Sequence, residues 1–186
     1  MRKIVERRGA AHQLLQKNTF FRPPKAEQIF KRVSLHRLCK EGNVEGVSER
    51  LKKQGVNVNA RDKYGKTPLH WAATENHLGI ARLLLGKGAN PNAKDKLGWT
   101  PLAWAVIEDH QEMVRLLVEH GANVNIQDAM GRTPLMAAAW NDRLEIAKLL
   151  LGKGAYPNLR DRDGKTAQDW ARIFGHSEMI KLLEGC

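Results

Sequence analysis

The 186-residue chain has few of the features that mark secreted or membrane proteins. It contains only two cysteines, Cys39 and Cys186, which give neither a disulfide framework nor the spacing of a metal site. Its apolar runs, such as 102–107, are far shorter than the roughly 20 residues that a membrane-spanning helix needs. Residues 1–9 lack the apolar core of a secretory signal. We therefore expect an intracellular, cytoplasmic protein with no transmembrane segment, and a nuclear or organellar location stays open.

Acidic residues are also scarce, with 20 Asp and Glu against 31 Lys and Arg, for a formal net charge of +11. The excess is uneven, because residues 1–33 hold nine basic residues and two acidic ones. We expect this segment to be a basic N-terminal arm or a helical extension that precedes a folded domain at 34–186. Basic arms bind nucleic acid or anionic surfaces through phosphate contacts, which is the alternative to the function predicted below.

The clearest pattern in the sequence is a period of 33 residues. Related segments begin at Asp62, Asp95, Asp128 and Asp161, each with Gly three residues later and Thr five residues later. Gly at that place favours a turn, while Thr, followed by Pro in the first three segments, is typical of a helix start. A second apolar stretch with helical spacing follows and ends at Gly. Each unit is therefore predicted to be a turn followed by two helices.

The motif Asp-x-x-Gly-x-Thr-Pro-Leu-His-x-Ala-Ala at 62–73 and the Gly-Ala-Asn-x-Asn endings at 88–92 and 121–125 resemble the ankyrin repeat family. The resemblance covers 34–186 and implies an all-α ankyrin-repeat solenoid of stacked turn–helix–helix units, with about four full repeats plus a capping N-terminal repeat. The implied units are the N-terminal capping repeat 34–61, then 62–94, 95–127 and 128–160, and the C-terminal capping repeat 161–186.

Catalytic or metal-binding chemistry is not indicated by the sequence. Six of the seven histidines fall on repeat positions or next to them; in the family, the place of His36 and His70 holds a structural hydrogen-bonding residue. The Gly-rich segments 85–88 and 151–154 end helices and lack the Lys-Ser/Thr of a nucleotide loop. Cys39 is most simply a small apolar residue in the first repeat. We predict a protein that is not an enzyme, with no catalytic residue, metal or cofactor.

Partner specificity in a solenoid must come from positions that stacking leaves free. In an array of this family, the turn tips and the end of the first helix line the concave face. Large apolar residues occupy several of these positions: Tyr64, Leu97, Trp99, Ile107, Met130 and Trp140. Exposed aromatic residues and Met are typical of binding hot spots, so we expect partner anchors here, with packing inside the stack as the alternative. Trp71, Trp104 and Trp170 share one helix position and are assigned to packing.

A basic fringe follows the turns, and its members are Arg61, Lys63, Lys66, Lys94, Lys96, Arg132, Arg160, Arg162 and Lys165. Exposed charges contribute little unless a complementary surface meets them, so a merely solvated edge is the alternative. Together the two features predict a monomeric, non-catalytic scaffold or adaptor that binds another protein with an acidic surface.

Overall fold

The computed structural model describes residues 33–186, and within this range the chain forms ten helices and no strand. This confirms the predicted all-α solenoid. The first helices of the five units are α3 (Leu35–Lys40), α5 (Pro68–Thr74), α7 (Pro101–Ile107), α9 (Pro134–Trp140) and α11 (Ala167–Phe174). The second helices are α4 (Val44–Leu51), α6 (Leu78–Gly86), α8 (Gln111–Glu119), α10 (Leu144–Gly152) and α12 (Ser177–Glu184). The predicted basic arm lies outside the described residues apart from Val33, and it stays a prediction.

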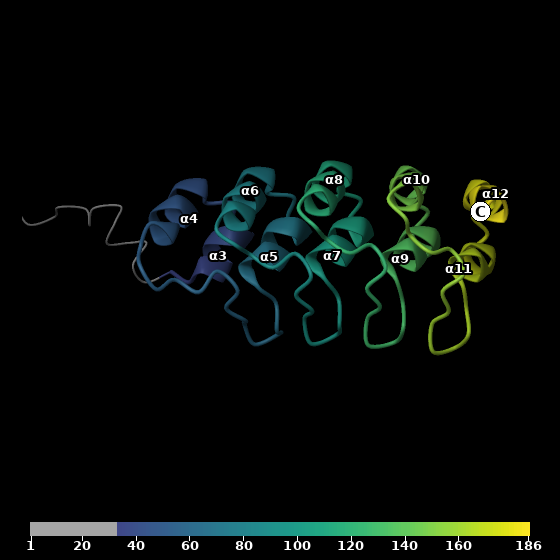
Figure 1. Ribbon diagram of the computed structural model, residues 1–186, viewed down its shortest axis with the longest axis horizontal. Helices are drawn as coiled ribbons and strands as arrows, with labels where there is room; N and C mark the ends of the chain where they lie inside the picture. Colours follow the sequence, from purple (N-terminus) through teal and green to yellow (C-terminus); the bar gives the residue numbers. More distant parts are fainter. Residues whose placement is uncertain (1–32) are drawn as a thin grey trace, which may run out of the picture. The chain divides into compact units, whose positions relative to one another are not determined.

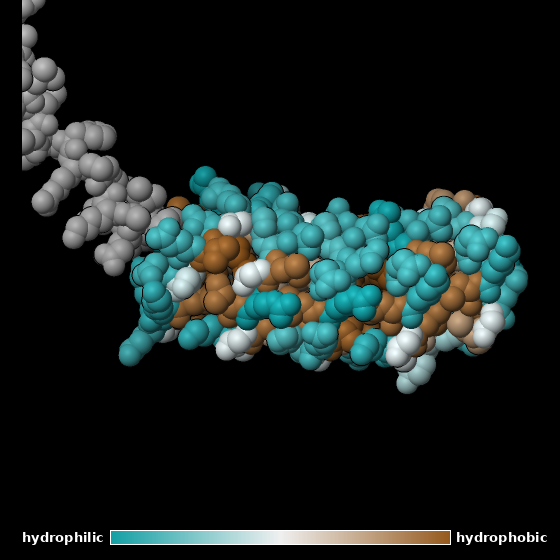
Figure 2. All heavy atoms as spheres, turned by 90° about the horizontal axis from the view of Figure 1, so that it is seen from above, coloured by the Kyte–Doolittle hydropathy of each residue, from teal (hydrophilic) through white to brown (hydrophobic). Residues whose placement is uncertain are grey.

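The helices form two layers that run along the solenoid (Figure 1). Each first helix contacts the first helix of the next unit, and each second helix does the same in its own layer. The turns project from the layer of first helices, on the side away from the second helices (Figure 1). Seen from above the second helices, hydrophilic residues cover most of the surface, with apolar residues between them (Figure 2). None of the helices in the described part of the chain is long and apolar enough to span a membrane.

Local chemistry explains where each turn and first helix begins. Gly98 has a φ of 84°, and a Cβ there would lie 2.5 Å from the backbone nitrogen of Ala129, so only Gly fits beside the next turn. The helix after this turn begins at Pro101, and the side chain of Thr100 caps it by accepting a hydrogen bond from the backbone N–H of Ala103. The same order recurs every 33 residues, which gives the units their common geometry.

The core lies between the two layers of helices. Leu69, Leu102 and Leu135 come from first helices, while Met113 and Ile146 come from second helices, and all are at most 1% exposed. Complete burial of a side chain of this size contributes about 1.5–3 kcal/mol of transfer free energy. Small residues such as the alanines of α9 let neighbouring first helices approach closely. The leucines and alanines of the first helices, which belong to the Thr-Pro-Leu-His-x-Ala-Ala part of the motif, therefore form much of the core.

His70 joins two units through a buried hydrogen-bond relay. Its Nδ1 accepts from the backbone N–H of Thr67 at 3.0 Å, so the neutral ring carries its proton on Nε2 and donates to the carbonyl oxygen of Trp99 at 3.1 Å. The side chain is fully buried, and burial lowers the pKa of His70 to about 4. The structural hydrogen-bonding role expected at this place is thus confirmed.

Candidate partner-binding surface

Each turn is organised by the carboxylate of its first Asp. In the first full repeat, Asp62 Oδ1 accepts from the backbone N–H groups of Tyr64 and Lys66, and Oδ2 accepts from Trp71 Nε1 at 2.9 Å. Burial alone would raise the pKa of Asp62, but these three hydrogen bonds outweigh it, and the pKa lies below the usual value. Trp104 and Trp170 donate in the same way to Asp95 and Asp161. Three indoles are therefore fixed between a turn and the first helix that follows it.

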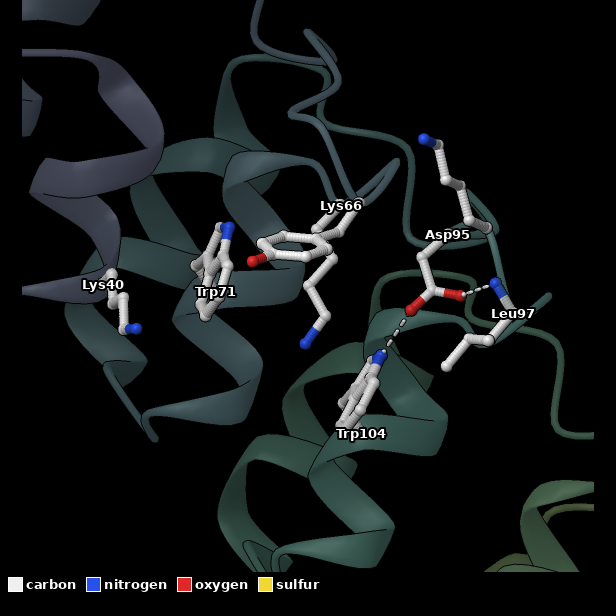
Figure 3. A pocket seen from close by; sticks show the side chains of 8 residues that line it. Lys40, Lys66, Trp71, Asp95, Leu97 and Trp104 are labelled. Atoms are coloured by element: carbon white, nitrogen blue, oxygen red, sulfur yellow. Dashed lines mark hydrogen bonds between the residues drawn. The ribbon is translucent and has the colours of Figure 1, made fainter.

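Lysine ammonium groups alternate with two of these indoles. Lys66 Nζ lies 3.5 Å from the ring centroid of Trp104 and 4.7 Å from that of Trp71, and Lys40 Nζ lies 4.6 Å from the Trp71 ring. Figure 3 shows the order Lys40, Trp71, Lys66 and Trp104 across three successive units. A cation–π contact contributes about 0.5–1 kcal/mol when exposed and about 2 kcal/mol when desolvated. The lysines therefore help to set the orientation of the indoles.

In the repeat 128–160, no indole can donate to the first Asp of the turn, because Ala137 stands where the neighbouring repeats carry Trp. The Asp128 carboxylate instead accepts from the guanidinium of Arg132, at 2.8 Å from Nε and 2.6 Å from Nη2. Arg132 Cζ also lies 4.9 Å from the Trp99 ring and 5.3 Å from the Trp140 ring. The Trp99 and Trp140 rings meet edge to face at 6.0 Å. The aromatic row thus continues across this repeat around Arg132.

The six predicted anchors differ in exposure. Tyr64, Leu97 and Met130 are 53%, 60% and 45% exposed at successive turn tips. Ile107 and Trp140 are half-buried at the ends of their helices. The expectation that Trp99 is exposed is wrong, since it is only 5% exposed beneath Arg132 and Trp140. Whether any of these residues contacts a partner stays a prediction.

The three exposed tips form a regular row. The carbonyl oxygen of Tyr64 accepts from the N–H of Lys96, and that of Leu97 accepts from the N–H of Ala129, at 3.0 and 3.1 Å. The carbonyl oxygen of Met130 accepts from the next turn in the same way. Backbone bonds therefore hold the three side chains one repeat apart. We call Tyr64, Leu97 and Met130, together with the indoles of Trp71, Trp104, Trp140 and Trp170, the turn-side surface.

The predicted basic fringe divides into three kinds of residue. Lys66 is only 9% exposed, so its placement on an exposed fringe is wrong: the two flanking indoles cover it. Arg61 and Lys94 each donate to the backbone carbonyl 33 residues further on, and these bonds tie successive turns together. The remaining members are exposed or half-buried: Lys63, Lys96, Arg132, Arg160, Arg162 and Lys165.

Trp71 and Trp104, which the sequence assigned to packing, are half-buried and also line a pocket of about 550 Å³. Tyr64 and Leu97 of the tip row are among the residues that complete its wall. Helical spacing could have identified the two indoles, because Trp104 lies three residues before Ile107, which was expected on the concave face, and Trp71 takes the same place in its own repeat. Residues three apart share one side of a helix.

Among residues 33–186, no three His, Cys, Asp or Glu side chains are grouped so that they could hold a metal ion. Burial raises the pKa of the Cys39 thiol to about 12, so this side chain stays protonated and poorly nucleophilic.

The sequence matches a family of known proteins described as ankyrin repeats (3 copies), over residues 4–95 and 87–161. It is 42% identical over 57 residues to acyl-CoA-binding domain-containing protein 2 of Arabidopsis thaliana, which covers 31% of this chain and 16% of that protein. It is 33% identical over 82 residues to acyl-CoA-binding domain-containing protein 6 of Danio rerio, which covers 40% of this chain and 26% of that protein. The matched segments thus span about a quarter or less of these relatives.

Proposed function

The chain belongs to the ankyrin repeat family, and we propose that it is a scaffold or adaptor that binds a partner protein on its turn-side surface. Ankyrin repeats are protein–protein interaction modules, and proteins built from them are typically non-catalytic. The observation that carries the proposal is the row of exposed apolar tips formed by Tyr64, Leu97 and Met130. Stacking of the repeats does not require large apolar side chains at these tips, since the bonds that join the turns use backbone atoms and the side chains of Arg61 and Lys94.

The tips are also held rigidly, which favours binding. The Asp62 and Asp95 carboxylates each fix two backbone N–H groups of their turn, and backbone bonds join one turn to the next. A preorganised surface loses little conformational entropy when a partner binds, so more of the contact energy remains as affinity. Aromatic and Met side chains supply large contact areas of the kind found at hot spots.

The exposed cations on the same side support an acidic partner. Lys63, Lys96 and Arg162 lie at the turn tips, and all three are exposed. Long-range attraction between such a row and an acidic surface raises the association rate and suppresses basic competitors. The lysines and arginines therefore select the partner, while the apolar tips contribute most of the buried area.

The names of the relatives refer to a domain that binds acyl-CoA. Their matched segments of 57 and 82 residues are about two repeats long and cover 16% and 26% of those proteins. A likeness of this extent supports shared repeats, and we propose no acyl-CoA site in this chain.

Affinity capture with matched variants tests the proposal. The triple variant Tyr64→Ser, Leu97→Ser and Met130→Ser removes the apolar tips, and Leu83→Ser removes an apolar side chain that is 37% exposed on the second helix α6. We expect the proteins retained by the unaltered chain to be retained by the Leu83 variant and lost by the triple variant. Thermal unfolding of each variant shows whether the fold is intact. Equal capture by a folded triple variant would contradict the proposal.

A further inference from the structure

The pocket behind the tip row is lined mainly by residues of the repeats 62–94 and 95–127, and Lys40 of the unit 34–61 also lines it. Lys66 stands between the faces of Trp71 and Trp104, and Leu97 and Asp95 lie on the side of the next turn (Figure 3). At about 550 Å³, the pocket has room for more than one side chain of a partner. Aromatic and aliphatic side chains form much of its wall, and three lysines also line it, of which Lys66 is the least exposed.

Within residues 33–186, the Lys66 ammonium group has no hydrogen-bond acceptor and no ion pair, although the residue is only 9% exposed. An ammonium group carries three N–H donors, and the indole faces satisfy them only through their quadrupoles. Burial lowers the pKa of Lys66, and this effect outweighs the opposite influence of Asp95, Asp62, Glu108 and Glu75. The ammonium nitrogen still reaches solvent, but the repeats themselves offer it no acceptor, so a carboxylate in the pocket would stabilise it.

The two carboxylates that influence Lys66 most are already occupied. Asp62 Oδ1 accepts from two backbone N–H groups, and its Oδ2 accepts from Trp71 Nε1. Asp95 does the same with the N–H groups of Leu97 and Trp99 and with Trp104 Nε1. Turning either carboxylate toward Lys66 would break bonds that hold a turn together. Neither of these two carboxylates is free to pair with Lys66, which leaves room for an acceptor supplied by a partner.

We propose that this pocket receives a glutamate or aspartate side chain from an extended segment of the partner protein, whose carboxylate accepts hydrogen bonds from Lys66 Nζ. An apolar side chain next to the acid covers Leu97 and the face of Trp104. The exposed lysines Lys40 and Lys96 line the same pocket and add positive charge. This inference rests on the proposed function, which it deepens by naming the group that the partner inserts.

Other occupants fit the pocket less well. A basic side chain would meet the like charges of Lys40, Lys66 and Lys96. A purely apolar side chain would remove the remaining water from Lys66 and leave the ammonium unpaired, which is costly for a buried charge. A carboxylate joined to an apolar neighbour can accept hydrogen bonds from Lys66 and also cover the apolar side chains that line the pocket.

A displayed library of random linear peptides tests the inference on the full chain. We expect the selected peptides to share an acidic residue beside an aromatic or aliphatic one. The acid of a selected peptide is then replaced by its amide, Glu→Gln or Asp→Asn, and the dissociation constant is measured. On the unaltered chain, this change should weaken binding about 10- to 100-fold, as expected for the loss of one member of a desolvated charge pair.

The same pair of peptides is measured on Lys66→Met, with Lys87→Met as the control. Lys87 is exposed at the end of α6, so both variants lose one positive charge and differ only in place. Replacing the acid by its amide should raise the dissociation constant at most about two-fold on Lys66→Met, and by the full ~10- to 100-fold on Lys87→Met. If Lys66→Met does not unfold cooperatively, Lys66→Gln serves with the same expectation.

The outcomes separate this inference from the proposed function. Two results would overturn the inference and leave the turn-side surface as the binding site. In the first, the selected peptides need Leu97 but share no acidic position. In the second, replacing the acid by its amide weakens binding as much on Lys66→Met as on the unaltered chain. Peptides whose binding is unchanged by Leu97→Ser overturn both.

Discussion

Lowering the pH should destabilise the solenoid through His70. The ring is neutral in the folded protein because burial lowers the pKa of His70 from 6.5 to about 4, whereas the unfolded chain leaves it near 6.5. Between these values the unfolded state binds more protons, so stability is lost as the pH falls from 6.5 toward 4. Proton linkage gives a loss of about 2 kcal/mol between about pH 7 and about pH 5.

Urea unfolding followed by tryptophan fluorescence measures this loss. The variant His70→Gln keeps a side-chain amide at the place of the imidazole but cannot be protonated. Every other titratable group is unchanged, so the difference between the two proteins isolates His70. We expect the unaltered chain to lose about 2 kcal/mol more than the variant over this pH range. An equal loss in both proteins would refute the conclusion that a neutral, buried His70 joins the two repeats.

Two further predictions concern stability, measured by urea unfolding. Trp99→Ala should cost about 3–5 kcal/mol because its indole is buried, whereas Leu97→Ser at an exposed tip should change stability by at most about 0.5 kcal/mol. A loss for Trp99→Ala as small as that for Leu97→Ser would show that Trp99 is not part of the packed stack. Gly98→Ala should cost at least about 1–3 kcal/mol because of its positive φ and its approach to Ala129, while Gly79→Ala, inside α6 with open space around it, should stabilise by about 0.5–1 kcal/mol. A neutral Gly98→Ala would contradict the close contact between turns.

The helices and turns could be predicted from the sequence because each depends on residues close to it in the chain. Gly98 sets the backbone of its turn, and Thr100 and Pro101 begin the following helix. The same residues recur every 33 positions, so the structure expected for one unit predicts the helices and turns of the others.

The depth of individual side chains could not be predicted in the same way. Trp99 occupies a position that the repeat leaves free, but Arg132 and Trp140 of the next unit cover it. Lys66 is likewise enclosed by two indoles, one from its own repeat and one from the next. Position within the repeat indicates which side a residue faces, whereas its burial depends on which large side chains the neighbouring unit happens to carry.

Site-specific photo-crosslinking tests the central claim most directly. A benzophenone amino acid is placed at Leu97 on the turn-side surface and, in a second protein, at Leu83 on the second helix α6, both of which are exposed. We expect bound partner protein to be crosslinked from position 97 and not from position 83. Crosslinks from position 83 alone would contradict it and place the binding site on the layer of second helices.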